Sequence, residues 1–297
     1  MIVAIGVDVD PTFATFVDRA LEAAAPLQVV NLRAAVEGEW RFDVPALGSA
    51  TLRYGGLSVE LRPDDAFYCR IMDLSSRSRD SIARRRWQAL QLGLRAWLDS
   101  IPGLVVNRWR GGVHNSSKPL HEAVLCELGF RVPESVTSSD PDELRRFVRA
   151  GPAVSKPICG ARADSALCEE RDLEDFESAS GPVHLQRFVG GADARVHVVG
   201  ERLVAQRASR GKVDYRAGGF KDMAIFEPPA ALRDLLVEGT RAMGLEFAGW
   251  DFKIDDEDRY WCLEANPMPG YSPYDDRCDG AISRQLLRHL EEGAPNP

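Results

Sequence analysis

The 297-residue sequence contains no Cys-x-x-Cys pair, and its six cysteines lie mostly inside apolar runs. This absence argues against a zinc site and against disulfides, and favours reduced, packed thiols. No apolar run approaches the roughly 18 to 20 residues that a membrane span needs. With 44% hydrophobic and 28% charged residues, the composition is not that of a disordered chain. These features predict a globular protein without a membrane partner, and we place it in the cytoplasm.

The sequence also has fewer basic than acidic residues. The chain has 37 Lys and Arg against 45 Asp and Glu, which gives a net charge of −8. This balance argues against a nucleic acid or an anionic membrane as partner. The apolar residues 1–7 have no basic leader, so we expect a core strand there and no signal peptide. No Gly-x-Gly-x-x-Gly follows that strand, so we place no dinucleotide on it.

Two short apolar runs near the C-terminus predict adjacent antiparallel strands. The first covers 247–254, four acidic residues follow at 255–258, and the second run starts at Arg259. Successive residues of a strand point to opposite faces. The apolar side chains of Trp250 and Phe252 therefore share one face, and Asp251 lies on the other.

The same alternation predicts a cluster of oxygen ligands. It places Cys262, Glu264 and Asn266 on one face of the second strand, where Glu264 and Asn266 can meet Asp251. Two carboxylates and one amide oxygen suit a magnesium ion that keeps some waters and shares its other positions with phosphates. Pro267 then ends the strand abruptly and stiffens the chain behind the ligands. The alternative is a hairpin whose polar residues face solvent.

Residues 1 to about 108 predict a Rossmann-like α/β unit. We expect its elements at 2–7 (strand), 13–25 (helix), 27–32 (strand), 51–61 (hairpin around Gly55-Gly56), 66–72 (strand) and 81–101 (helix). Tyr68 and Arg70 come at the end of a strand, the rim where α/β units place ligand contacts. We therefore expect Tyr68 and Arg70 to contact the substrate.

A basic cluster follows this strand: Arg77, Arg79, Arg84, Arg85 and Arg86. In an acidic protein, such a cluster is either the solvated start of a helix or a docking patch for an acidic partner segment. The sequence leaves both open.

A second region begins after residue 114. Lys118 opens a helix with Ser116 or Ser117 as N-cap, and Asp140 caps the next helix. Lys156 lies in the strand expected at 153–157, where an ammonium among apolar neighbours needs an anion. Strands dominate from 183 to 266, interrupted by one helix at about 229–243. A final helix is expected at 279–291.

From about Asn107 to Leu290, this order of elements resembles that of ATP-grasp ligases, and within them the RimK-like branch. The anchors are Lys118 with Lys156, the hinge 186–189, Asp193-Ala-Arg195, Asp214-Tyr-Arg216, and the triad Asp251, Glu264 and Asn266. Sequence detail around Tyr68-Cys-Arg70, Asn107, 115–118 and 214–216 is most similar to maturases of ribosomally made peptides. The resemblance implies an α/β (α+β) chain with an ATP-grasp fold behind a Rossmann-like pre-ATP-grasp domain. Its domains would be 1–108, 109–182 (central subdomain) and 183–297 (C-terminal subdomain with the metal site).

The resemblance also implies residue roles. Magnesium, as two ions bridged by Glu264, would be held by Asp251, Glu264 and Asn266. ATP would be bound by Lys118, Lys156, Gln186, Arg187, Phe188, Val189 and Asp193. Arg195, Arg207 and Arg216 would neutralise the charge on the transferred phosphoryl group and the acyl-phosphate. The alternative for each arginine is an ordinary surface salt bridge.

The implied reaction is attack of a substrate carboxylate on the γ-phosphate of ATP, which gives an acyl-phosphate that an amine or a hydroxyl captures as an amide or ester. The sequence does not decide whether the substrate is a peptide or a small molecule, or whether the chain forms a homodimer. Two alternatives remain: a phosphotransferase acting on a small-molecule hydroxyl, and a non-catalytic nucleotide-binding scaffold. Only its product separates the phosphotransferase from the ligase, and the intact metal triad and lysine pair argue against the scaffold.

Overall fold

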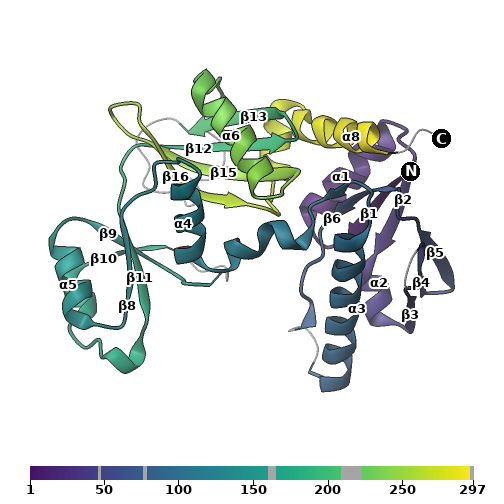
Figure 1. The fold of residues 1–297 in the computed structure, drawn as a ribbon, viewed down its shortest axis with the longest axis horizontal. Helices are drawn as coiled ribbons and strands as arrows, with labels where there is room; N and C mark the ends of the chain where they lie inside the picture. The colour runs from purple at the N-terminus through teal and green to yellow at the C-terminus, as the bar shows by residue number, and fades with distance from the viewer. Residues whose placement is uncertain (46–47, 76–78, 160–164, 209–222, 295–297) are drawn as a thin grey trace.

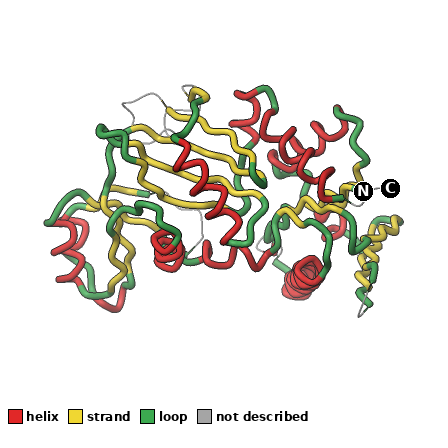
Figure 2. Tube along the Cα trace, turned by 45° about the horizontal axis from the view of Figure 1, so that its top comes forward, coloured by secondary structure: helices red, strands yellow, loops and turns green. Residues whose placement is uncertain are grey.

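The computed structural model describes residues 1–45, 48–75, 79–159, 165–208 and 223–294. Figure 1 shows an elongated molecule with a small sheet and α5 (Pro141–Arg149) at one end and the N-terminal unit at the other. A five-stranded sheet lies between them, with α6 (Ala230–Ala242) across it. Figure 2 shows the same succession of strands and helices from a second direction.

The N-terminal unit has a parallel sheet in the order β2-β1-β6-β7. Its elements are β1 (Ile2–Gly6), α1 (Pro11–Glu22), β2 (Leu27–Asn31), α2 (Leu32–Glu37), β6 (Ala66–Cys69) and β7 (Val105–Val106). Asp10 caps α1 by accepting a hydrogen bond from the Thr12 N–H at 3.1 Å. The parallel pairing confirms the expected α/β arrangement.

A second, antiparallel sheet covers this unit with strands β3 (Trp40–Asp43), β4 (Ala50–Tyr54) and β5 (Leu57–Leu61). Gly55 and Gly56 both have positive φ, 55° and 77°, which the two-residue turn between β4 and β5 requires. The long helix α3 (Ser81–Ser100) buries Trp87, Leu90 and Leu94 against the same core, so the apolar spacing predicted this helix correctly.

The central sheet has the order β10-β9-β11-β8, from β8 (Ser135–Ser138), β9 (Ala153–Lys156), β10 (Ala166–Cys168) and β11 (Val183–Arg187). The boundary expected at residue 182 falls inside it. Because β11 pairs with both β8 and β9, it belongs to the central subdomain, and the chain leaves that subdomain after Arg187. The sequence analysis predicted no strand where β8 lies, since four residues carry too little alternation to mark one.

The C-terminal sheet has the order β14-β13-β12-β15-β16. Its strands are β12 (Ala192–Val199), β13 (Arg202–Ala208), β14 (Met223–Ile225), β15 (Phe247–Ile254) and β16 (Tyr260–Asn266). One face packs Trp250, Phe252 and Leu236 into a core that also takes Leu125 of α4 (Lys118–Glu127). The helix α8 (Ala281–Gly293) packs against β12 and β13 of this sheet and also against α1 and β6, so the two ends of the chain share a core.

Short elements complete the described fold: the α-helix α7 (Ser272–Asp275) and the 3₁₀ turns η2 (Trp109–Ser116), η3 (Glu170–Leu173), η4 (Ser178–Ser180) and η6 (Asp276–Cys278). None of the helices in the described residues is both long and apolar enough to cross a bilayer.

One face prediction for β16 is wrong. The pairing of β15 with β16 shifts after Asp251, because Asp251 lies opposite Glu264 whereas Phe252 lies opposite Cys262. Leu263 is therefore an extra residue in the ladder, a β-bulge that reverses the faces on either side of it. Cys262 is fully buried in the core, and only Glu264 and Asn266 remain on the face of Asp251.

Candidate active site

The structure brings the expected acidic residues together on the side of the C-terminal sheet opposite its apolar core. Asp251 and Glu264 form a direct cross-strand pair, and Asn266 lies two residues further along β16 on the same face. Each carboxylate meets a cation: Lys118 Nζ lies 3.0 Å from Glu264 Oε1, and Arg195 Nη1 lies 2.6 Å from Asp251 Oδ2. The site is therefore a compact set of alternating charges contributed by α4, β12, β15 and β16.

This donor set fits magnesium. In the described residues no group of three His, Cys, Asp or Glu side chains could hold a metal ion. The predicted set instead combines two adjacent carboxylates with the Asn266 amide oxygen, which accepts the Met268 N–H at 2.8 Å and has a second lone pair. Such a set leaves the remaining positions of a six-coordinate ion to water and phosphate oxygens.

The guanidinium of Arg195 occupies space that Gly249 leaves open. A Cβ built on Gly249 would lie 2.2 Å from Arg195 Nη2, so any larger residue would displace the guanidinium. Arg195 also donates from Nε to His197 Nε2 at 3.3 Å. These contacts hold its guanidinium against the carboxylate face.

Of the other two predicted arginines, only Arg207 lies in the described residues, and it is not placed there. Arg207 pairs with Ala194, whose side chain lies in the apolar core, so Arg207 is on the opposite face of the sheet from Arg195. Its guanidinium lies 5.7 Å from the ring of Phe226. The neighbouring Gln206 takes the position opposite Arg195 instead. Alternation along a strand shows which of its residues share a face. It does not show which face of β13 lies on the same side of the sheet as Arg195. Arg216 and Asp214 lie outside the described residues.

Lys156 is held by a buried polar network. Its Nζ donates to Gln186 Oε1 at 2.5 Å, and Gln186 Nε2 donates to Glu122 Oε1 at 2.6 Å. Glu122 also accepts from His184 Nε2 at 3.1 Å and from Ser135 Oγ at 2.5 Å. Sequence reasoning missed Glu122. The available signal was its position four residues after Lys118, a carboxylate on the buried side of α4.

Burial and charge shape the ionisation of this network. Burial lowers the pKa of Lys156, and the nearby Lys118 lowers it further, while Glu122, Glu264 and Asp251 oppose the shift. Burial raises the pKa of Glu122, but hydrogen bonds from His184 and Ser135 outweigh it and leave that pKa lowered. Burial also raises the pKa of Glu264, but Lys118, His121 and Arg195 together outweigh it and leave that pKa lowered. A desolvated ammonium beside carboxylates is suited to binding an anion such as a phosphate.

Two stacked histidines brace β16 beside the carboxylates. His121 Nε2 accepts the Ala265 N–H at 2.9 Å, so its proton is on Nδ1. His121 Nδ1 lies 2.8 Å from His114 Nδ1 and donates to it, and the rings stack with centroids 5.0 Å apart. His121 thus holds the main chain between Glu264 and Asn266 only while it is neutral.

We therefore predict a loss of stability in mild acid. Burial lowers the pKa of His121 from 6.5 to about 4. Below pH 6.5 the unfolded chain binds the proton and the native ring does not, so the contribution is complete above pH 6.5 and is lost as the pH falls toward 4. Proton uptake by His121 in the unfolded chain should lower the free energy of unfolding by about 2 kcal/mol as the pH falls from 7 to 5. Urea unfolding of wild type and His121→Gln at both pH values tests this; equal pH dependence would contradict it.

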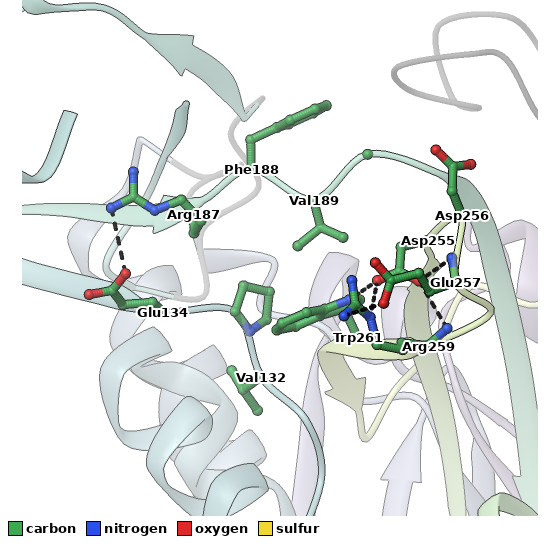
Figure 3. Close-up of a pocket in the computed structure, with 12 residues that line it drawn as sticks. Val132, Glu134, Arg187, Phe188, Val189, Asp255, Asp256, Glu257, Arg259 and Trp261 are labelled. Carbon is green, nitrogen blue, oxygen red and sulfur yellow. Dashed lines mark hydrogen bonds and ion pairs between the residues drawn. The ribbon is translucent and has the colours of Figure 1, made fainter. Parts of the chain in front are cut away.

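The hinge residues Arg187, Phe188 and Val189, but not Gln186, line a pocket of about 700 Å³ between the central and C-terminal sheets. Figure 3 shows Val189 projecting from the hinge toward the side of the pocket that holds Trp261. The main-chain N–H groups of Arg187 and Phe188 are bound to Glu134 O and Pro152 O, at 2.7 and 2.9 Å. Asp193, next along the chain, forms a buried ion pair with Lys253 at 2.8 Å.

The expected substrate contacts at Tyr68 and Arg70 are corrected by the structure. Tyr68 is buried and its ring stacks on Phe16 at 3.9 Å. Arg70 is 4% exposed, and its guanidinium binds Asp10 and the carbonyl of Pro269. Both side chains are therefore committed to the protein interior.

The fold is shared with solved ligases. A RiPP-associated ATP-grasp ligase from Chryseobacterium gregarium, solved with ADP and a leader and core peptide, superposes with a TM-score of 0.82 at 17% identity, over 99% of this chain and 97% of that one. The chain has the ATP-grasp ligase fold. The macrocyclase MdnC from Microcystis aeruginosa, solved with its precursor peptide, gives 0.80 at 18% identity over 97% and 98%. These likenesses confirm the predicted fold.

Sequence comparison gives the same family resemblance. A probable alpha-L-glutamate ligase from Xanthomonas campestris is 29% identical over 186 residues, and one from Pasteurella multocida is 27% identical over the same length. These matches cover 57% of this ATP-grasp chain, which spans 63% and 58% of the two relatives. No protein-family model matches. The predicted likeness to RimK-like ligases is confirmed.

Proposed function

We propose that the protein is an ATP-dependent ligase that activates a carboxylate as an acyl-phosphate and passes it to an amine or hydroxyl, releasing ADP and phosphate. The observation that carries the proposal is a charge cluster in which Lys118 of α4 and Lys156 of the central sheet lie near Asp251, Glu264 and Arg195 on the polar face of the C-terminal sheet. Phosphoryl transfer needs mainly positioning and charge neutralisation, which this cluster supplies.

Each side chain has a task that its surroundings allow. Lys156 and Lys118 bind phosphate oxygens, since Lys156 projects from the central sheet toward the carboxylate face and Lys118 opens α4 beside it. Arg195, which is already desolvated, meets charge on the transferred group. Asp251, Glu264 and Asn266 hold magnesium, which screens the phosphate charge when bound.

The hinge pocket receives the base of ATP. With the N–H groups of Arg187 and Phe188 bound elsewhere, the N–H of Val189 is the hinge donor that meets the base. Gln186 contributes to ATP binding by holding Lys156, because its side-chain amide is bound between Lys156 and Glu122. Asp193 and Lys253 close the side of the site toward the ribose.

The substrate we propose is a peptide or an amino acid with a side-chain or terminal carboxylate. The neighbours in the fold comparison include ligases solved with precursor peptides, and the sequence relatives are named as glutamate ligases. Incubation with ATP, magnesium, hydroxylamine and either glutamate or acidic peptides should yield a hydroxamate and ADP. A phosphorylated hydroxyl without hydroxamate would instead establish a phosphotransferase, and AMP would contradict the proposal.

The arginines at the start of α3 are proposed to recruit an acidic segment of that substrate. Arg79, Arg84 and Arg85 are exposed, and Arg86 lies over the ring of Trp40 at 5.4 Å; Arg77 lies outside the described residues. Cations at a helix N-terminus oppose the helix dipole, so the cluster does not stabilise α3.

We predict that reversing Arg84, Arg85 and Arg86 to Glu raises KM for the acidic substrate with little change in kcat, the pattern of lost uniform binding. Salt should weaken substrate binding in the wild type, because exposed charges are screened over roughly 8 to 10 Å. Steady-state kinetics at low and high salt measure both effects, with KM for ATP as the internal control. An unchanged substrate KM would leave the cluster a solvated helix start.

A further inference from the structure

The carboxyl edge of the N-terminal parallel sheet lies against the chain that follows the carboxylate hairpin. Arg70 directly follows β6 and Asn107 directly follows β7, and these two strands are neighbours. In open α/β sheets this edge is where ligands bind. Here both side chains reach the main chain of residues 267–269.

Asn107 has its full hydrogen-bonding capacity in use. Its Nδ2 donates to Phe247 O at 2.6 Å and to Pro267 O at 2.5 Å. Its Oδ1 accepts from the N–H groups of Glu246 and Phe247, at 2.8 and 3.0 Å. An amide has two donors and two acceptor positions, so this orientation satisfies all four. One side chain therefore ties the first residue of β15 to the residue after Asn266.

The same short segment is enclosed by further contacts. Arg70 Nη1 donates to Pro269 O at 2.8 Å while its Nε binds Asp10. A Cβ built on Gly112 would lie 2.7 Å from Pro267 Cγ, so the proline ring fills the space that the glycine leaves. Residues 267–269 are thus fixed by hydrogen bonds and by close packing from the N-terminal half of the chain.

We infer that Asn107 is a positioning residue for the magnesium–nucleotide site, which it sets by fixing Asn266 relative to Asp251 through Phe247 and Pro267. All four hydrogen bonds of the Asn107 amide are made with main chain, so it acts on the site through these segments. This inference rests on the proposed function, and it gives the N-terminal sheet edge a role in the chemistry that needs no bound dinucleotide. Outer groups of this kind change metal affinity or activity by about 10- to 100-fold.

The neighbouring Arg108 offers a matched control. It also binds main-chain carbonyls, those of Leu98, Ile101 and Gly103, but all of these lie at the end of α3. Asn107→Ala and Arg108→Ala should both lower Tm, since each leaves carbonyls without donors. Of these two variants, Asn107→Ala alone should increase hydrogen exchange in peptides covering residues 260–271 and weaken binding of a non-hydrolysable ATP analogue with magnesium, by about 10- to 100-fold. Gly112→Ala, which loses no hydrogen bond, should weaken the same binding by displacing Pro267.

Several outcomes would overturn the inference. Exchange in 260–271 that stays at the wild-type level in Asn107→Ala would show that the amide does not fix this segment. Equal nucleotide affinity in Asn107→Ala and Arg108→Ala would reduce Asn107 to a general stabilising role. Failure of the wild type to bind the analogue would instead contradict the proposed function, whereas the exchange experiment would still test the contacts of Asn107.

Discussion

Asp251→Asn, Glu264→Gln and Asn266→Ala should each lower the rate of ATP-dependent ligation by about a hundredfold to a thousandfold. Each variant removes an oxygen ligand or its charge from the face that meets the phosphates. The two carboxylates are cross-strand neighbours on paired strands beside the bulge at Leu263, so no flexible loop can substitute another ligand. Hydroxamate formation under single-turnover conditions measures the effect.

The controls must separate chemistry from folding. Asp251→Asn leaves the buried guanidinium of Arg195 with a neutral partner, so this variant should lose stability as well. Glu264→Gln should lose less, because its pair with Lys118 is more exposed. Asp258→Asn, at a left-handed position in the turn of the same hairpin, should keep full activity, since Asn tolerates that φ. Wild-type activity in any one triad variant would remove that residue from the metal site.

Lys156→Met should weaken binding of a non-hydrolysable ATP analogue by about 10- to 150-fold, the loss expected when one charge-assisted hydrogen bond is removed. In the free protein the same ammonium is desolvated, and burial is the main cause of its lowered pKa. Replacing it with an apolar side chain of similar length removes this desolvation cost but leaves Gln186 Oε1 without its donor, so Tm should change little. A large loss of affinity with a small change in stability is what a functional lysine predicts.

Isothermal titration with the analogue, together with a thermal melt, decides the role of Lys156. Arg146→Met removes an exposed cation from the same subdomain and should change neither quantity. Binding of the carboxylate substrate should change less than that of the nucleotide. A lower Tm with unchanged affinity would instead give Lys156 a structural role in the Glu122 network.

The sequence predicted the elements whose signal is local. The helix expected at 81–101 is α3 (Ser81–Ser100), because its apolar side chains recur at the spacing that buries one face. The cap at Asp140 is confirmed by its hydrogen bond to the Asp142 N–H at 2.9 Å. The hairpin at Gly55-Gly56 and the antiparallel pair carrying Asp251 and Glu264 are likewise as predicted. In each case residues close in sequence contain the whole signal.

What the sequence alone determined is which residue types recur at which spacing: the fold class, most strands and helices, and a set of carboxylates and cations suited to phosphate. Tertiary structure decided how they meet. The bulge at Leu263 removed Cys262 from the polar face, and the pairing of β13 placed Arg207 away from Arg195. Arg70 and Asn107 bind main chain 199 and 160 residues away. Such contacts depend on register and on packing between distant segments, and no local period in a chain encodes either.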